Sequence, residues 1–141
     1  MIQIYVGCSL TQAPEEFRQG VEDLKSALRR EGYDIPDFLG LVAGTPLDVY
    51  EVDIHERVAQ CDMLLAICDF PSIGLGWEMG TAVEKHRKPV LAVVHRKTQL
   101  TRLVVGADCA RNPLYRFEQY DDWEEVIALV DEFIRAMLAV R

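Results

Sequence analysis

The chain has 141 residues, half of them hydrophobic, which suits one domain with a sizeable core. Its 15 basic and 23 acidic side chains give a net charge of −8, and this argues against duplex DNA and anionic membranes as partners because both require a basic surface. We therefore expect one domain, residues 1–141, that acts on small molecules or binds other proteins.

Cysteine usage and the first residues point to a cytoplasmic protein. Cys8, Cys61, Cys68 and Cys109 lie far apart, without the paired spacings of a zinc site or the density of a disulfide scaffold. The chain opens with neither a basic segment nor a long apolar stretch, so we expect no signal peptide and no spanning helix. No metal, cofactor or membrane partner is implied.

Short apolar strands alternate with amphipathic helices along the chain. Apolar alternation marks the first strand, Pro14 and Gly32 bracket the first helix, and Pro36 shortens a possible second strand. In order, we predict a strand at 2–6, a turn at 7–11, a helix at 14–31, a short strand at 33–35, a loop at 37–46 that could cover a ligand, a helix at 48–60, a strand at 63–67, a helix at 77–86, a strand at 89–94, a short helix at 101–105, a strand at 114–117 and a helix at 122–140.

This alternation predicts an α/β domain with a doubly wound, Rossmann- or flavodoxin-like parallel sheet of about five strands and helices on both faces. Ligands of such sheets bind beyond the carboxyl ends of the strands. The turn at 7–11 and the loop at 69–80 both lie at such ends. We expect the functional site there.

The loop at 69–80 is the most informative segment. Gly74, Gly76 and Gly80 follow the hydroxyl of Ser72, and such a loop lets backbone N–H groups approach an anion such as a sugar phosphate. Glu78, expected on the first turn of a helix, would repel that anion unless it reacts with another part of the ligand. The structural alternative is a carboxylate that only complements the helix dipole.

Several segments together carry a family resemblance. Residues 4–9 (IYVGCS), Asp53, Asp62, residues 71–80 (PSIGLGWEMG) and residues 88–91 (KPVL) occur in this order. Over roughly residues 2–106 the chain resembles the nucleoside 2-deoxyribosyltransferase superfamily. The form of the Glu78 loop is most similar to the branch of 2'-deoxynucleoside 5'-monophosphate N-glycosidases.

The resemblance implies three catalytic residues. Glu78 would attack C1' of the deoxyribosyl group, Asp53 would protonate the leaving base and later act as a general base, and Tyr5 would orient Glu78. A carboxylate nucleophile with a nearby proton donor suits cleavage through an oxocarbenium-like state. As alternatives, Asp53 could form a surface ion pair with Arg57 four residues later, and Tyr5 could be a packed core aromatic.

The resemblance also implies how the substrate is held. Ser9 and Ser72 match hydroxyls that bind the 5'-phosphate, and Thr101 matches a hydroxyl that a neighbouring subunit contributes, so a homodimer is implied. Trp77 could stack on the base or sugar, or could belong to the core. The predicted substrate-binding residues are Ser9, Ser72, Gly74, Gly76, Trp77 and Thr101.

One departure concerns the phosphate. The glycosidase branch tends to carry Arg-Gly-Gly after the first serine, whereas residues 10–13 are Leu-Thr-Gln-Ala. We hypothesise that Lys97 or Arg102 replaces the lost positive charge.

The predicted function is hydrolysis of the N-glycosidic bond of 2'-deoxynucleoside 5'-monophosphates or related nucleotides and nucleosides. One alternative is a transferase that moves deoxyribose between bases, which requires the same residues. A second is a non-catalytic nucleotide-binding domain, because function resides in the site and not in the fold.

Overall fold

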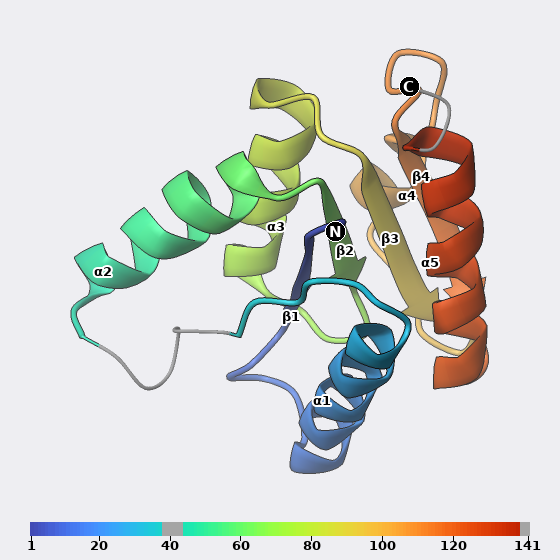
Figure 1. Cartoon of the computed structure of the whole chain (residues 1–141), viewed down its shortest axis with the longest axis horizontal. Coiled ribbons are helices and arrows are strands. Elements are labelled where there is room, and N and C mark those ends of the chain that lie inside the picture. Colours follow the sequence, from blue (N-terminus) through green and yellow to red (C-terminus); the bar gives the residue numbers. More distant parts are fainter. Residues whose placement is uncertain (38–43, 139–141) are drawn as a thin grey trace.

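The computed structural model describes residues 1–37 and 44–138. Most of the predicted loop at 37–46, and the end of the predicted helix at 122–140, lie outside these ranges. No helix within them is long and apolar enough to cross a membrane. The elements are β1 (Ile4–Cys8), α1 (Glu15–Arg30), α2 (Pro46–Tyr50), η1 (Glu51–Val58), β2 (Met63–Ile67), α3 (Ile73–Gly80), η2 (Thr81–Lys85), β3 (Val90–His95), α4 (Arg102–Gly106), β4 (Tyr115–Tyr120) and α5 (Trp123–Met137) (Figure 1).

The strands form one parallel sheet in the order β1-β2-β3-β4. The predicted α/β class with a parallel, Rossmann-like sheet is therefore confirmed, with four strands in place of about five. The segment expected as a short strand at 33–35 makes only one bridge, between Gln3 and Asp34, on the outer side of β1. Pro36 lacks the N–H that a longer ladder would require.

The first strand extends further than its sequence pattern predicts. Gly7 and Cys8, expected in a turn, pair with Ala66 and Ile67 of β2. Every residue of β1 is buried, because helices cover both faces of the sheet. The alternation of apolar and polar residues therefore marks the start of this strand correctly but not its end.

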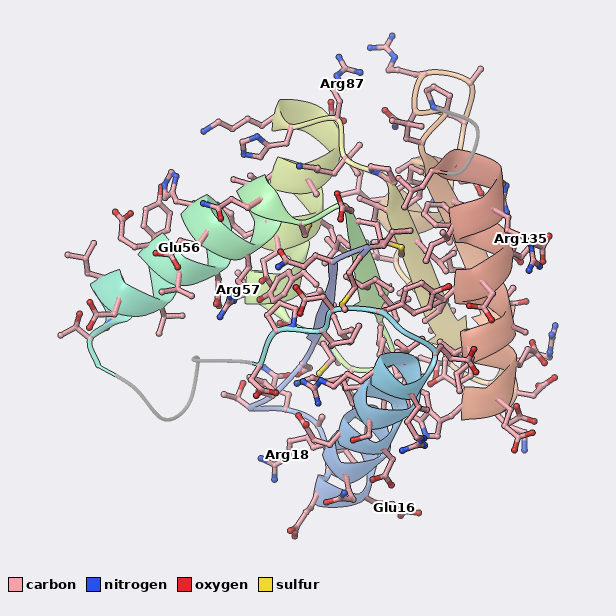
Figure 2. The ribbon with its side chains drawn as sticks, in the orientation of Figure 1. Glu16, Arg18, Glu56, Arg57, Arg87 and Arg135 are labelled. Carbon is pink, nitrogen blue, oxygen red and sulfur yellow. The ribbon has the colours of Figure 1, made fainter. Side chains whose placement is uncertain are left out.

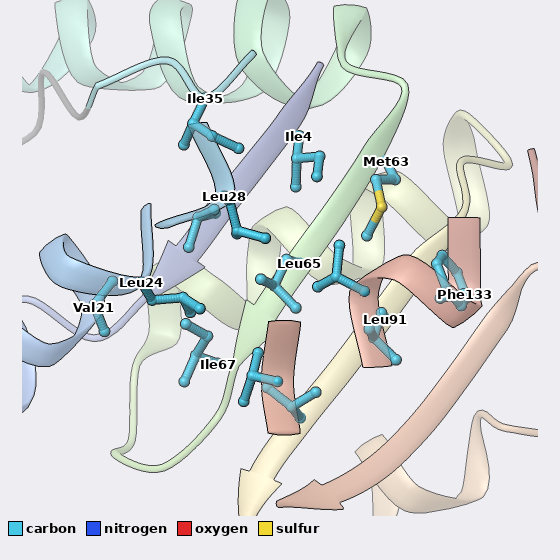
Figure 3. Close-up of a cluster of buried hydrophobic side chains, with 14 of the residues drawn as sticks. Ile4, Val21, Leu24, Leu28, Ile35, Met63, Leu65, Ile67, Leu91 and Phe133 are labelled. Atoms are coloured by element: carbon cyan, nitrogen blue, oxygen red, sulfur yellow. The ribbon is translucent and has the colours of Figure 1, made fainter. Parts of the chain in front are cut away.

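Helices pack on both faces of the sheet, as predicted. On one face α1 and α5 cover apolar side chains such as Leu65 and Leu91 (Figure 3). On the other, η1, α3 and η2 cover a second cluster that includes Tyr5 and Leu64. Charged side chains such as Glu16 and Arg135 extend away from the core into solvent (Figure 2).

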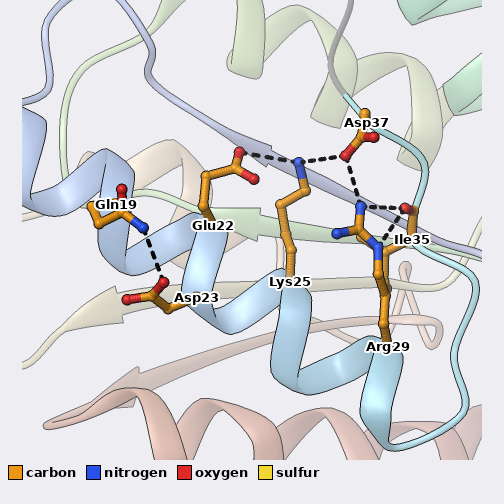
Figure 4. A network of polar contacts seen from close by, with 7 residues as sticks. All are labelled: Gln19, Glu22, Asp23, Lys25, Arg29, Ile35 and Asp37. Atoms are coloured by element: carbon orange, nitrogen blue, oxygen red, sulfur yellow. Dashed lines mark hydrogen bonds and ion pairs between the residues drawn. The ribbon is translucent and has the colours of Figure 1, made fainter.

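A polar network attaches the chain that follows the Asp34 bridge to α1. The Lys25 ammonium group is almost fully buried and lies 3.2 Å from Glu22 and 3.7 Å from Asp37 (Figure 4). Arg29 donates hydrogen bonds to the Ile35 carbonyl and to Asp37, and the bond to Asp37 lowers the pKa of that carboxyl. This network holds residues 35–37 against the helix.

The helix predicted at 48–60 is α2 continued by the π-helical segment η1. Thr45 caps its start: the Thr45 hydroxyl accepts the N–H of Asp48, and the Asp48 carboxylate accepts the N–H of Thr45. A π-helical segment is uncommon and often occurs at a functional site. Asp53 lies within η1.

Candidate active site

The candidate site lies between η1 and α3, the helix that follows β2. Ser72 is the N-cap of α3, and its hydroxyl accepts the N–H of Leu75 at 3.1 Å. The helix therefore starts at Ile73, earlier than predicted, and Glu78 lies on its second turn. The expectation that Glu78 occupies the first turn was wrong. The helix-dipole alternative does not explain Glu78 either, because the effect of the dipole falls off beyond the first turn.

Glu78 is a buried carboxyl group with one strong partner. The residue is only 8% exposed, and its Oε2 accepts a hydrogen bond from the Tyr5 hydroxyl. Burial raises the Glu78 pKa to about 7; the Tyr5 hydrogen bond opposes this rise and the charge of Asp53 adds to it. A carboxyl with such a pKa changes its ionisation state around neutral pH.

Tyr5, the second residue of β1, reaches Glu78 across the face of the sheet that α3 covers. Its side chain belongs to the core on the α3 side of the sheet, so the packed-aromatic alternative is correct as far as the ring is concerned. Its hydroxyl, however, is engaged with Glu78, and burial together with that carboxylate raises the Tyr5 pKa far above its usual value. Tyr5 therefore stays protonated and acts as a hydrogen-bond donor.

Gly7 allows α3 to approach β1 this closely. A Cβ atom at Gly7 would lie 2.8 Å from Leu75 Cδ1 and 3.7 Å from Glu78 Oε1. Real Cβ contacts are essentially never as short as the first of these distances. A side chain at residue 7 would therefore require the Leu75 side chain to move, and Gly7 lets Leu75 of α3 pack directly against β1.

Asp53 and Glu78 line the same cavity, which has a volume of about 210 Å³. Burial raises the Asp53 pKa, and the positive charge of Arg57 lowers it. The ion pairs between described residues engage Lys25, Arg29 and Arg96, so the alternative of a surface ion pair between Asp53 and Arg57 is not what the structure contains.

Further walls of this cavity come from α3 and from the helix of Asp53. Gly74 and Trp77 lie on the α3 side, and Trp77 is 62% exposed, so it is not a core residue. Tyr50, which no sequence motif indicated, lies opposite, and its hydroxyl is 3.1 Å from His55 Nε2. Its spacing of three residues from Asp53 on a helix is a signal that could have identified it.

The Ser9 hydroxyl is the second unusual polar group of this region. Ser9 follows β1 directly, as Cys68 and the loop leading to Ser72 follow β2, and the ends of these strands are paired. Ser9 is 1% exposed, and its Oγ has no hydrogen-bond partner among the described residues. An unpaired buried hydroxyl is costly, which is typical of a group that a ligand satisfies.

Of the predicted site residues, four line this cavity: Asp53, Gly74, Trp77 and Glu78. Tyr5, Ser9, Ser72, Gly76 and Thr101 do not line it. Gly76 lines another groove, between α3 and α4, together with Leu103. Thr101 is exposed at the start of α4, and Lys97 and Arg102 are also exposed. Asp62 accepts the N–H of Gln3 at 2.8 Å, which is a structural contact.

The chain is similar in sequence and in fold to known proteins. The chain is 28% identical over 123 residues to a protein of Thermofilum pendens named "Putative 2'-deoxynucleoside 5'-phosphate N-hydrolase 1", with 81% of this chain and 82% of the relative covered. A solved structure, the CMP N-glycosidase BcmB of Clostridium botulinum, superposes with a TM-score of 0.71 at 18% identity, covering 93% of this chain and 98% of that one. No family model matches the chain. The resemblance to nucleoside 2-deoxyribosyltransferase-like proteins is confirmed.

Proposed function

We propose that this protein hydrolyses the N-glycosidic bond of 2'-deoxynucleoside 5'-monophosphates or closely related nucleotides, through a covalent intermediate on Glu78. The observation that carries the proposal is the buried Glu78 carboxyl, which accepts a hydrogen bond from Tyr5 and shares its cavity with Asp53. A nucleophile and a proton donor at one small cavity are what glycosidic cleavage requires.

In the first step, the ionised Glu78 attacks C1' and the bond from C1' to the base nitrogen breaks. Asp53 gives its proton to the departing base. Burial raises the Asp53 pKa, which favours its role as the acid, and a Glu78 pKa of about 7 leaves part of this carboxyl ionised at neutral pH. The Tyr5 hydroxyl favours the ionised form of Glu78.

In the second step, water attacks C1' and the bond to Glu78 breaks. The Asp53 carboxylate, which lost its proton in the first step, takes one from this water. The products are the free base and the sugar phosphate, and both carboxyl groups return to their starting states. No metal ion or cofactor takes part in this scheme.

Ser9 and Ser72 are proposed to hold the 5'-phosphate. The buried Ser9 hydroxyl lacks a partner among the described residues, and the Ser72 hydroxyl, although it accepts a hydrogen bond, still carries a hydrogen to donate. Gly74 belongs to the first turn of α3, whose N–H groups favour an anion. Neutral donors of this kind suit a site that already contains two carboxyl groups.

The names of the two compared proteins support the reaction and the substrate class. One is called a 2'-deoxynucleoside 5'-phosphate N-hydrolase and the other a CMP N-glycosidase. Both names describe cleavage of a base from a nucleoside monophosphate. They differ in the sugar, so the preference for deoxyribose or ribose has to be measured.

We further propose a cytoplasmic homodimer in which Thr101 completes the partner's site. The groove between α3 and α4 supports a second copy as its occupant, because Leu103 beside it is 80% exposed and Ile73 on α3 is 90% exposed. The four cysteines are unpaired, which fits a reducing compartment.

The decisive experiment is chromatography of the bases released from deoxynucleoside monophosphates, the matching nucleosides and ribonucleotides, with wild type and Glu78→Ala in parallel. We expect release from monophosphates by wild type only, and trapping of the glycosyl-enzyme on Glu78 by mass spectrometry after denaturation. Exchange onto an added second base would indicate a transferase. Binding without any product would instead support a non-catalytic nucleotide-binding domain.

Subunit complementation tests the role of Thr101. Glu78→Ala and Thr101→Ala proteins are each expected to lose activity, and a mixed dimer would regain one complete site. Activity that returns on co-expression supports a shared site, whereas a monomeric mass in light scattering would rule it out.

A further inference from the structure

Arg57 lies beside the catalytic groups although nothing in the proposed reaction uses it. It follows Asp53 by four residues on η1, so the two side chains lie on the same side of the helix. In Figure 2 the Arg57 side chain projects from this helix toward the end of the molecule at which α3 begins.

The Arg57 guanidinium group is partly buried and incompletely paired. Its Nε atom is buried and has no hydrogen-bond partner among the described residues, and none of their ion pairs engages Arg57. A buried N–H group without a partner is energetically costly. An unpaired buried donor of this kind is explained if it gains a hydrogen-bond acceptor in another state of the protein, for example during the reaction.

The charged groups around Asp53 indicate that the acceptor for Arg57 is the ionised Asp53 carboxylate. Glu78 from α3 and Tyr50 from α2 are the other titratable groups that line the cavity beside Asp53, and Tyr5 from β1 donates a hydrogen bond to Glu78. Among these three groups, Glu78 alone forms a carboxylate. Arg57 is the cation that acts on both Asp53 and Tyr5, and its charge lowers the pKa of each against the effect of burial.

We propose that Arg57 is a positioning residue that binds and stabilises the Asp53 carboxylate after Asp53 has given its proton to the leaving base. Both residues are described, and no ion pair joins Asp53 and Arg57 in the structure. Once ionised, Asp53 gains a charge-assisted hydrogen bond from the unpaired Arg57 donor, which also holds it in place to receive the proton of water. This inference rests on the proposed function.

Arg18 provides a matched control. It is also partly buried, and its Nε is also buried without a partner among the described residues, but it lies on α1. Figure 2 shows it well separated from Arg57. A general effect of removing a partly buried arginine should therefore appear equally in Arg18→Gln and Arg57→Gln.

The test compares the pH profiles of kcat and KM for wild type, Arg57→Gln, Arg57→Lys and Arg18→Gln on the nucleotide that wild type cleaves. We expect Arg57→Gln to lower kcat about tenfold, with little change in KM, and to move the alkaline limb of the profile to higher pH because Asp53 keeps its proton longer. Arg57→Lys should retain most of the activity, and Arg18→Gln should match wild type.

An NMR titration of the Asp53 carboxyl carbon makes the test independent of turnover. Arg57→Gln is expected to raise the Asp53 pKa, whereas Arg18→Gln leaves it unchanged. An unaltered Asp53 titration in Arg57→Gln would overturn the proposal, as would an Arg57→Lys enzyme as impaired as Arg57→Gln. If wild type released no base at all, the proposed function would fail, and the titration would still decide whether Arg57 and ionised Asp53 interact.

Discussion

The Tyr5 hydroxyl donates a hydrogen bond to the Glu78 carboxyl group across 73 positions of sequence. Tyr5 lies on a buried strand and Glu78 on the second turn of a helix, so both are held by rigid elements and neither by a loop. Pairing of this kind orients a nucleophile and adjusts its proton affinity at the same time.

Loss of the Tyr5 hydroxyl should therefore change the pH dependence of the enzyme. Its hydrogen bond lowers the Glu78 pKa, so Tyr5→Phe should raise that pKa and move the acidic limb of the kcat/KM profile to higher pH. At pH 6 we expect a loss of about ten- to a hundredfold. Tyr115→Phe is the control, because its hydroxyl donates to the Val104 carbonyl away from the cavity. Equal profiles for Tyr5→Phe and wild type would contradict the role of this bond.

Glu78 should also make the stability of the protein depend on pH. Its pKa is about 7 in the folded state, whereas the ordinary value of 4.5 applies once the chain unfolds, so between these values the folded state binds more protons than the unfolded state. Stability contributed by protonated Glu78 is thus present below about pH 4.5 and is lost as the pH rises through 7.

Replacement of Glu78 by Gln removes the cost of burying an ionised carboxylate. We expect Glu78→Gln to raise the free energy of unfolding at pH 8 by about 1 to 3 kcal/mol, with a much smaller gain at pH 5. Urea denaturation at the two pH values measures the difference, with the exposed Glu84→Gln as the control. A gain of equal size at both pH values would show that the effect is not one of ionisation.

Gly7→Ala tests the close approach of β1 and α3. The new methyl group would lie 2.8 Å from Leu75 Cδ1, so we expect a loss of about 1 to 3 kcal/mol in stability and reduced activity as α3 shifts. Adding Leu75→Val removes the clashing atom, and the double variant should lose less than the sum of the two single changes. Gly80→Ala, where nothing lies within 4 Å, should be neutral or stabilising.

The two serines should separate binding from stability. Ser72→Ala removes the N-cap of α3 and should cost about 1 kcal/mol, whereas Ser9→Ala removes an unpaired buried hydroxyl and should cost little. Both should raise KM for monophosphates more than for nucleosides. Thermal unfolding and paired kinetics on the two substrate types measure these effects; an unchanged nucleotide preference would exclude both serines from phosphate binding.

Local patterns were sufficient for much of the fold. Alternating strands and helices predicted the parallel sheet, and the Glu78 loop was correctly placed between β2 and a helix. The prediction of a fifth strand at 33–35 was wrong. This segment is short and is followed by Pro36, and its pairing is limited to the bridge between Gln3 and Asp34. The predicted start of α3 at residue 77 was also wrong, because the helix begins at Ile73 after the Ser72 cap. Gly74 and Gly76 have low helix propensity, so little in the sequence indicates a helix there.

The sequence by itself determined which chemical groups this protein has available: a carboxylate in a glycine-rich loop, a second on a helix, and a tyrosine on the first strand. Only the tertiary structure decided that Glu78 is buried against Tyr5, that its pKa rises to about 7, and that Ser9 Oγ and Arg57 Nε are buried without partners among the described residues. The physical reason is that residue type and local spacing set the ionisable groups and the secondary structure, whereas burial and the distances between charges arise only when distant segments pack together.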